Sequence, residues 1–133
     1  MSYIDPSGFT KEDVLRAISI ASREYSRVSG INPTFTNLGG DTVGRTKFGL
    51  FGSEMQIDSA YLGVLNDAQK IDLLNTVLHE SKHYQDGFWG NLAGELSGGW
   101  NKKFGDWQYH VDIYNSSSVL TEKYRNEYLC GKK

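Results

Sequence analysis

The sequence predicts a single α+β domain in which helices pack on a small antiparallel sheet. Two observations support this fold class: helical spacing of apolar residues on both sides of the chain's centre, and an alternating strand pattern between them. With 133 residues and 38% apolar content, the chain can bury one compact core but is short for two typical domains. We therefore expect one α+β domain.

The first predicted element is an N-terminal helix of about five turns. Thr10, followed three positions later by Asp13, is typical of a helix N-cap, and Gly30 offers a C-terminal stop. Between them, apolar side chains recur on one face at Val14, Ile18, Ala21 and Tyr25. The pattern predicts a helix that packs this face on the core.

A small antiparallel sheet is predicted next. Residues 37–41 contain the glycines and polar residues of a turn, and strand signals follow at 48–51. Gly52 and Ser53 indicate a second turn, and apolar residues then alternate from Met55 to Tyr61. This order is typical of a twisted hairpin.

A second helix follows the sheet and contains the segment LLNTVLHESKHYQDGF, residues 73–88. Asn66 and Gln69 have the spacing of a capping pair, and the apolar spacing continues to Phe88. On a helical wheel His79 and His83 share a polar stripe, separate from the apolar arc. This arc contains Ile71, Leu74, Val77, Leu78, Tyr84 and Phe88.

The spacing of these two histidines predicts a metal site. Side chains at i and i+4 lie on the same helix face, so the imidazoles of His79 and His83 can meet on one ion about 2.0–2.1 Å from each. Glu80 lies about a quarter-turn away and can reach a water on that ion. The alternative is a solvated polar stripe without a metal.

The remaining chain predicts a glycine-rich loop and two C-terminal helices. Residues 90–99 contain glycines at 90, 94, 98 and 99, which favour a loop. Helical spacing then extends from Phe104 to Tyr114, and Ser117 or Ser118 can cap a last helix.

Composition argues against several partners. The formal net charge of −2 and pI near 5.9 give no basic surface for a phosphate backbone, so we expect no nucleic-acid partner. No apolar run approaches the roughly 18 residues of a membrane span, and the N-terminus lacks the sections of a secretory signal. The single cysteine, Cys130, cannot form an internal disulfide.

The segment HESKH resembles the active-site helix of zincin-type zinc metallopeptidases. The resemblance implies a zincin-like domain in which His79 and His83 bind Zn²⁺ and Glu80 activates water for peptide hydrolysis. It also implies that an extended substrate pairs with a strand beside the cleft, for which Met55 to Tyr61 is the candidate. The Gly-x-x-His continuation of the metzincins is absent after the motif.

A third zinc ligand is expected downstream of the motif. We favour His110, because its helical spacing predicts a rigid platform. The surrounding segment resembles the one where many small zincins place a glutamate ligand, with histidine here in its place. The alternatives are Asp106, Asp112 and, in the predicted loop, Glu95. Asp106 and Asp112 are also candidates for orienting a ligand imidazole.

Tyr109 and Tyr114 are candidates for stabilising an oxyanion. A tyrosine hydroxyl near the metal can donate a hydrogen bond to a tetrahedral intermediate. The alternative is that they serve in packing, since the chain contains eight tyrosines.

The N-terminal segment Tyr3-Ile4-Asp5-Pro6-Ser7-Gly8-Phe9 has turn chemistry and resembles the tail that closes the core of Rhs repeat proteins. In those proteins, interchangeable C-terminal toxins follow this tail. The resemblance implies that residues 1–9 are a remnant of the Rhs core and residues 10–133 a toxin domain. It further implies a carrier Rhs core, a cognate immunity protein, and delivery out of the producing cell on the carrier without a signal peptide.

The sequence therefore predicts a zinc metallopeptidase effector that cleaves peptide bonds in a protein of the target cell. One alternative is a zinc peptidoglycan peptidase or amidase with the same chemistry. The other is a non-catalytic interaction domain with a degenerate HExxH motif.

Overall fold

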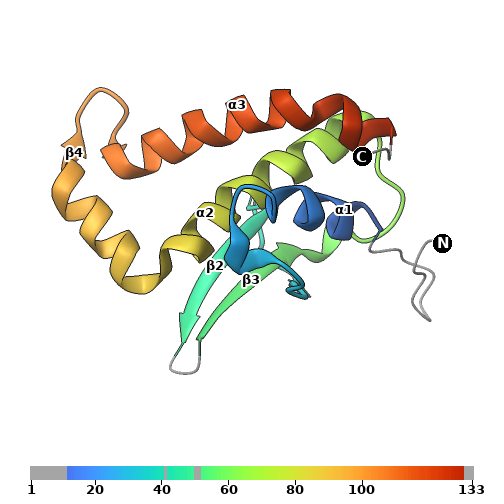
Figure 1. Cartoon of the computed structure of the whole chain (residues 1–133), viewed down its shortest axis with the longest axis horizontal. Helices are drawn as coiled ribbons and strands as arrows, with labels where there is room; N and C mark the ends of the chain where they lie inside the picture. Colours follow the sequence, from blue (N-terminus) through green and yellow to red (C-terminus); the bar gives the residue numbers. More distant parts are fainter. Residues whose placement is uncertain (1–11, 41, 50–51, 131–133) are drawn as a thin grey trace.

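A long helix, α2 (Asp67–Gly98), runs through the middle of the fold, and α1, α3, β2 and β3 all pack on it (Figure 1). The computed structural model describes residues 12–40, 42–49 and 52–130. The predicted N-cap Thr10 and the Rhs-like segment 1–9 lie outside these residues. Helices and a small sheet confirm the α+β class.

Helix α2 begins as predicted but extends further. The Asn66 side chain accepts from the Gln69 backbone and the Gln69 side chain accepts from the Asn66 backbone, which confirms the capping box. Gly87 has φ 71° and ψ 177°, so the helix breaks there and resumes to Gly98. The predicted end near Phe88 is wrong, because the break redirects the helix without ending it.

The N-terminal helix is shorter than predicted. Helix α1 spans Glu12–Ala21 and is followed by a short 3₁₀ helix, η1 (Ser26–Val28). The chain leaves the α-helix before Tyr25, whose backbone is extended, and Val28 is fully buried against the core. The prediction of five turns is wrong, because the helix ends at Ala21 and the chain turns so that Val28 enters the core.

The sheet is mixed, whereas an antiparallel sheet was predicted. Strands β2 (Gly44–Gly49) and β3 (Gly52–Asp58) form the expected antiparallel hairpin, but β1 (Thr34–Thr36) pairs in parallel with β3. The predicted turn at Gly52 and Ser53 lies inside β3, which ends at Asp58 before the 3₁₀ helix η2 (Ser59–Tyr61). The strand order is β1-β3-β2, and within the described residues β1 pairs with β3 only from Gln56 to Asp58.

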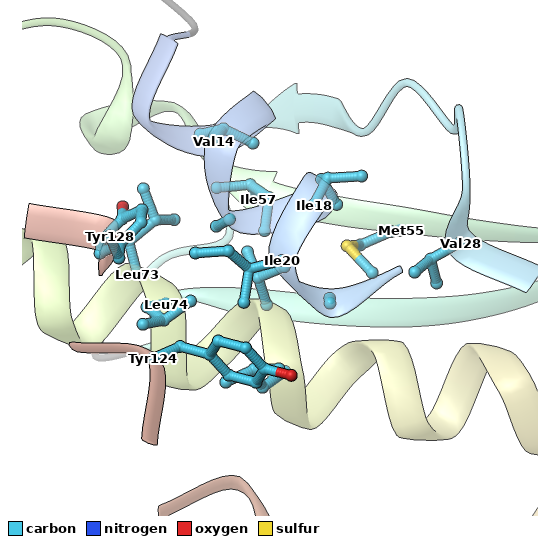
Figure 2. Close-up of a cluster of buried hydrophobic side chains, with 14 of the residues drawn as sticks. Val14, Ile18, Ile20, Val28, Met55, Ile57, Leu73, Leu74, Tyr124 and Tyr128 are labelled. Atoms are coloured by element: carbon cyan, nitrogen blue, oxygen red, sulfur yellow. The ribbon is translucent and has the colours of Figure 1, made fainter. Parts of the chain in front are cut away.

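The core forms where α1, the sheet and the ends of α2 and α3 meet (Figure 2). The buried set draws side chains from each of these elements: Val14, Ile18 and Ile20 from α1, Met55 and Ile57 from β3, Leu73 and Leu74 from α2, and Tyr124 and Tyr128 from α3. This core anchors the first half of α2, and with it the HESKH segment, against the sheet.

The glycine-rich segment is helical, contrary to the predicted loop. It forms the end of α2, and a Cβ at Gly94 would lie 2.4 Å from Cδ1 of Tyr109. Glycine is thus used there for close packing against α3, a role that local sequence does not distinguish from a loop. Glu95 therefore lies on a helix.

The C-terminal region is one helix and a small hairpin, not two helices. Strands β4 (Trp100–Asn101) and β5 (Asp106–Trp107) reverse the chain, and α3 (Gln108–Cys130) runs back along α2 (Figure 1). The Ser117 hydroxyl donates to the Tyr114 carbonyl inside α3, so this serine does not start a new helix. Among the described residues, no helix has the length and apolarity to cross a membrane.

Gly44→Ala is expected to destabilise the fold by about 1–3 kcal/mol, the usual cost of overpacking. A Cβ at position 44 would lie 2.6 Å from Cγ2 of Thr76 and 3.3 Å from the Gln56 carbonyl oxygen, where β2 crosses α2. Chemical denaturation measures the change in the free energy of unfolding. Thr76→Ser removes the clashing methyl, so the double variant should recover part of the loss. Equal stability of Gly44→Ala and wild type would contradict this account of the crossing.

Candidate metal centre and catalytic base

Two histidine nitrogens converge on one face of α2. His79 Nε2 lies 3.2 Å from His83 Nε2. Two ligands bound about 2.0–2.1 Å from a tetrahedral ion are about 3.3 Å apart, so this pair has the spacing of two ligands to one zinc. The predicted convergence of these side chains at i and i+4 is therefore present in the structure.

His79 is held in its neutral form. Burial, followed by the nearby charges of His83 and His110, lowers the pKa of His79 from 6.5 to about 4. Neutral imidazole is the form that binds a metal. Its Nδ1 is buried and, among the described residues, has no hydrogen-bond partner.

Glu80 is buried beside the histidine pair. Its exposed fraction is 9%, its Oε1 accepts a hydrogen bond from Thr46 Oγ1 at 2.7 Å, and its Oε2 lies 3.9 Å from His79 Nε2. Burial raises the pKa of Glu80 above its ordinary value of 4.5, and the Thr46 hydrogen bond opposes that shift. A carboxylate with a raised pKa is suited to exchanging protons as a general base. The sequence did not identify Thr46, because strand β2 reaches Glu80 only through the tertiary fold.

Glu80→Gln is expected to stabilise the metal-free protein at about pH 8, and the gain should shrink as the pH falls towards about 4.5. Because the folded-state pKa of Glu80 is raised, the folded protein binds this proton more tightly than the unfolded chain, and stability is lost as the pH rises through that pKa. Glutamine avoids the buried charge and keeps an acceptor for Thr46. Thermal or urea unfolding across this range measures the difference. A lower stability of the variant at high pH would contradict the expectation.

His110 lies at the start of α3, and its ring is 5.4 Å from the His83 ring. Its Nδ1 is 3.1 Å from Asp106 Oδ1, and its Nε2 is 3.2 Å from Glu95 Oε1. A neutral imidazole carries one N–H, so it satisfies only one of these carboxylates. Either a second proton or a cation at Nε2 would satisfy both contacts.

The other candidate ligands lie in different surroundings. Glu95, on the resumed part of α2, lines the same cavity as His83 and His110. Asp106 contacts Nδ1 of His110, on the side of the ring away from Glu95. A carboxylate in this position commonly orients a ligand imidazole. Asp112 is exposed and accepts from Gln108 Nε2 at 2.8 Å. Over the described ranges 12–40, 42–49 and 52–130, no three His, Cys, Asp or Glu side chains form a ready-made metal-binding group.

The two tyrosines occupy different environments. The Tyr109 hydroxyl donates a hydrogen bond to Asp86 and lies 3.0 Å from Asn91 Oδ1. Burial, together with the Asp86 carboxylate, raises the pKa of Tyr109. Tyr114 lies at the cavity wall with its ring 4.5 Å from the His79 ring. Of the two, Tyr114 has the better position for the predicted oxyanion role.

Two cavities meet at Glu80. One of about 410 Å³ lies beside His79, Tyr114 and the start of β2, and one of about 340 Å³ lies beside His83 and His110. Both are bordered by Gly44 and Glu80. Glu80 therefore borders both cavities although only 9% of its surface is exposed.

The donor atoms present fit zinc, which binds imidazole nitrogen and carboxylate oxygen well. The spacing of the His79 and His83 nitrogens supports this fit. Comparisons of the chain with models of protein families, with curated proteins and with solved structures find no match.

Proposed function

We propose that the protein is a zinc-dependent peptidase in which His79 and His83 hold the metal and Glu80 is the general base. The observation that carries the proposal is the 3.2 Å spacing of the two Nε2 atoms, with a buried carboxylate 3.9 Å from one of them. A solvated polar stripe would not require a buried glutamate hydrogen-bonded to a neighbouring strand.

His110 is the proposed third ligand. When the ring is neutral and donates its one N–H from Nδ1 to Asp106, Nε2 carries the lone pair that can bind a metal. A carboxylate on Nδ1 is the usual support for a ligand imidazole. Glu95, 3.2 Å from that Nε2, is the alternative ligand. Both side chains lie on helices, so either can be held rigidly.

Bound zinc would supply a Lewis acid that activates water and polarises a substrate carbonyl. Glu80 accepts the proton of the attacking water and later passes it to the leaving amine, the general-base and general-acid steps of amide hydrolysis. Thr46 orients the carboxylate by donating to Oε1. Tyr114, at the cavity wall, donates to the oxyanion.

The substrate is proposed to be a peptide in extended conformation along β2. The strand predicted for this role from the sequence corresponds largely to β3, which is already paired with β1 from Gln56 to Asp58 and with β2 along most of its length, so it is a poorer edge for another strand. Within the described residues β2 pairs only with β3, and Gly44, Thr46 and Phe48 border the cavity beside His83. Main-chain hydrogen bonds to such an edge are a common way to hold a peptide.

The proposed biological role is that of an effector delivered into a target cell. It is supported by the Rhs-like tail at residues 3–9, which lies outside the described residues. The proposal includes the Rhs carrier, a cognate immunity protein, and a target-cell protein as substrate. In Rhs proteins the domain after this tail is a toxin, which is the role proposed for the hydrolase here.

Bacterial growth after cytoplasmic production of wild type and Glu80→Gln tests this function, with zinc content measured on both purified proteins. We expect a toxic wild type, a harmless variant and about one zinc in each, because the substitution removes the base and spares the ligands. Absence of zinc from both would contradict the metal centre. Zinc in both without cytoplasmic toxicity, but with toxicity on export to the periplasm, would favour the peptidoglycan alternative.

A further inference from the structure

Asn91 is a buried polar residue that contacts the proposed ligand His83, and none of the roles proposed above involves it. Its exposed fraction is 9%, and it lies on the part of α2 that follows the break at Gly87. The changed direction of the helix lets the side chain reach back to His83, eight positions earlier.

The two N–H groups of Asn91 determine which way its amide points. Nδ2 donates to the His83 carbonyl at 2.9 Å and to the Gly87 carbonyl at 2.6 Å. Carbonyl oxygens only accept, so rotating the amide by 180° would place Oδ1 against two acceptors. The orientation with Oδ1 towards the His83 ring is therefore the one that satisfies both backbone carbonyls.

This orientation has a consequence for the imidazole. Asn91 Oδ1 is hydrogen-bonded to His83 Nδ1, and since Oδ1 can only accept, Nδ1 must carry the hydrogen. In a neutral ring the lone pair is then on Nε2, the atom 3.2 Å from His79 Nε2. We propose that Asn91 is a positioning residue that selects this tautomer of His83 and aims its Nε2 at the cation.

Neighbouring residues hold Asn91 in place. The Tyr109 hydroxyl lies 3.0 Å from Asn91 Oδ1 and also bonds the Asp86 carboxylate. The Tyr109 ring packs on Gly94, one turn after Asn91, where a Cβ would clash with the ring. The amide is thus fixed from α2 and α3 together. The assignment of a metal to Nε2 rests on the proposed function, whereas the tautomer of His83 does not.

The first test is the tautomer in the metal-free wild type. Nitrogen-15 imidazole shifts and two-bond couplings at about pH 8, where imidazoles are ordinarily neutral, identify the protonated nitrogen. Hydrogen on Nδ1 of His83 is expected, and hydrogen on Nε2 would overturn the proposal. This measurement requires neither zinc nor a variant.

The second test compares Asn91→Asp with Asn91→Leu. Aspartate keeps an acceptor for His83 Nδ1 but loses the two donors to backbone carbonyls, whereas leucine loses both functions. Zinc affinity, measured by competition with a chromophoric chelator, should fall about 10–100-fold in the leucine variant, the usual effect of losing a partner of a ligand. The aspartate variant should retain affinity within a few-fold even if it is less stable.

Equal losses in the two variants would show that Asn91 only supports the backbone, and would overturn the proposal. If the leucine variant does not fold, the wild-type tautomer and the aspartate variant still decide the question. A wild type that binds no zinc but carries the Nδ1 hydrogen would contradict the proposed peptidase while supporting the positioning of His83 by Asn91.

Discussion

Glu80→Gln is expected to lower kcat for peptide cleavage by about 10²–10⁴-fold, the usual contribution of a positioned general base. Glutamine has nearly the same shape and keeps an acceptor for the Thr46 hydroxyl, which lies 2.7 Å from Oε1. It cannot take a proton from water. A library of unstructured peptides, with cleavage followed by mass spectrometry, gives a substrate on which kcat and KM can be measured for both proteins.

The loss should occur in kcat with the zinc content unchanged, because the ligands are untouched. Glu122→Gln is the matched control: the same chemical change on α3, where the Glu122 side chain is 76% exposed and outside both cavities. It should cleave at the wild-type rate. If Glu80→Gln also cleaved at the wild-type rate, Glu80 would not be the general base.

His79→Gln and His83→Gln are each expected to weaken zinc binding by more than about 100-fold, the upper end of the loss seen when only a supporting partner is removed. The two Nε2 atoms are already at ligand spacing, so each substitution deletes one half of a preorganised pair. Chelator competition measures the affinity, and the absorption of a cobalt-substituted protein reports the ligand number. Retention of zinc by both variants would contradict the metal centre.

The same assay distinguishes the third ligand. His110→Gln and Glu95→Gln remove the two groups whose Nε2 and Oε1 atoms lie 3.2 Å apart. A large loss in the first variant alone would assign His110, and a large loss in the second alone would assign Glu95. Asp112→Asn is the control, because Asp112 is exposed and bonded to Gln108.

Short-range features of the fold could be predicted well from the sequence. The Asn66 and Gln69 capping box, the β2 and β3 hairpin and the helical position of HESKH are all present. Each depends on residues that are close to one another along the chain. The i and i+4 spacing of His79 and His83 likewise brings their nitrogens together through helix geometry alone.

Features that depend on contacts between elements, or on the break inside α2, were predicted wrongly or not at all. The glycine-rich segment is helical, with Gly94 packed closely against Tyr109, and β1 pairs in parallel although an antiparallel hairpin or sheet was expected. Thr46 on β2 and Asn91 beyond the helix break were not identified as parts of the site.

The sequence by itself therefore determined the α+β class and the histidine pair with its adjacent glutamate, since helical repeat geometry is a local property of the backbone. Only the tertiary structure decided the surroundings of that pair. Burial against β2 raises the pKa of Glu80, and the break at Gly87 brings the Asn91 amide to His83. These effects arise from desolvation and from hydrogen bonds that form only after β2 packs on α2 and α2 changes direction, which spacing along the chain does not encode.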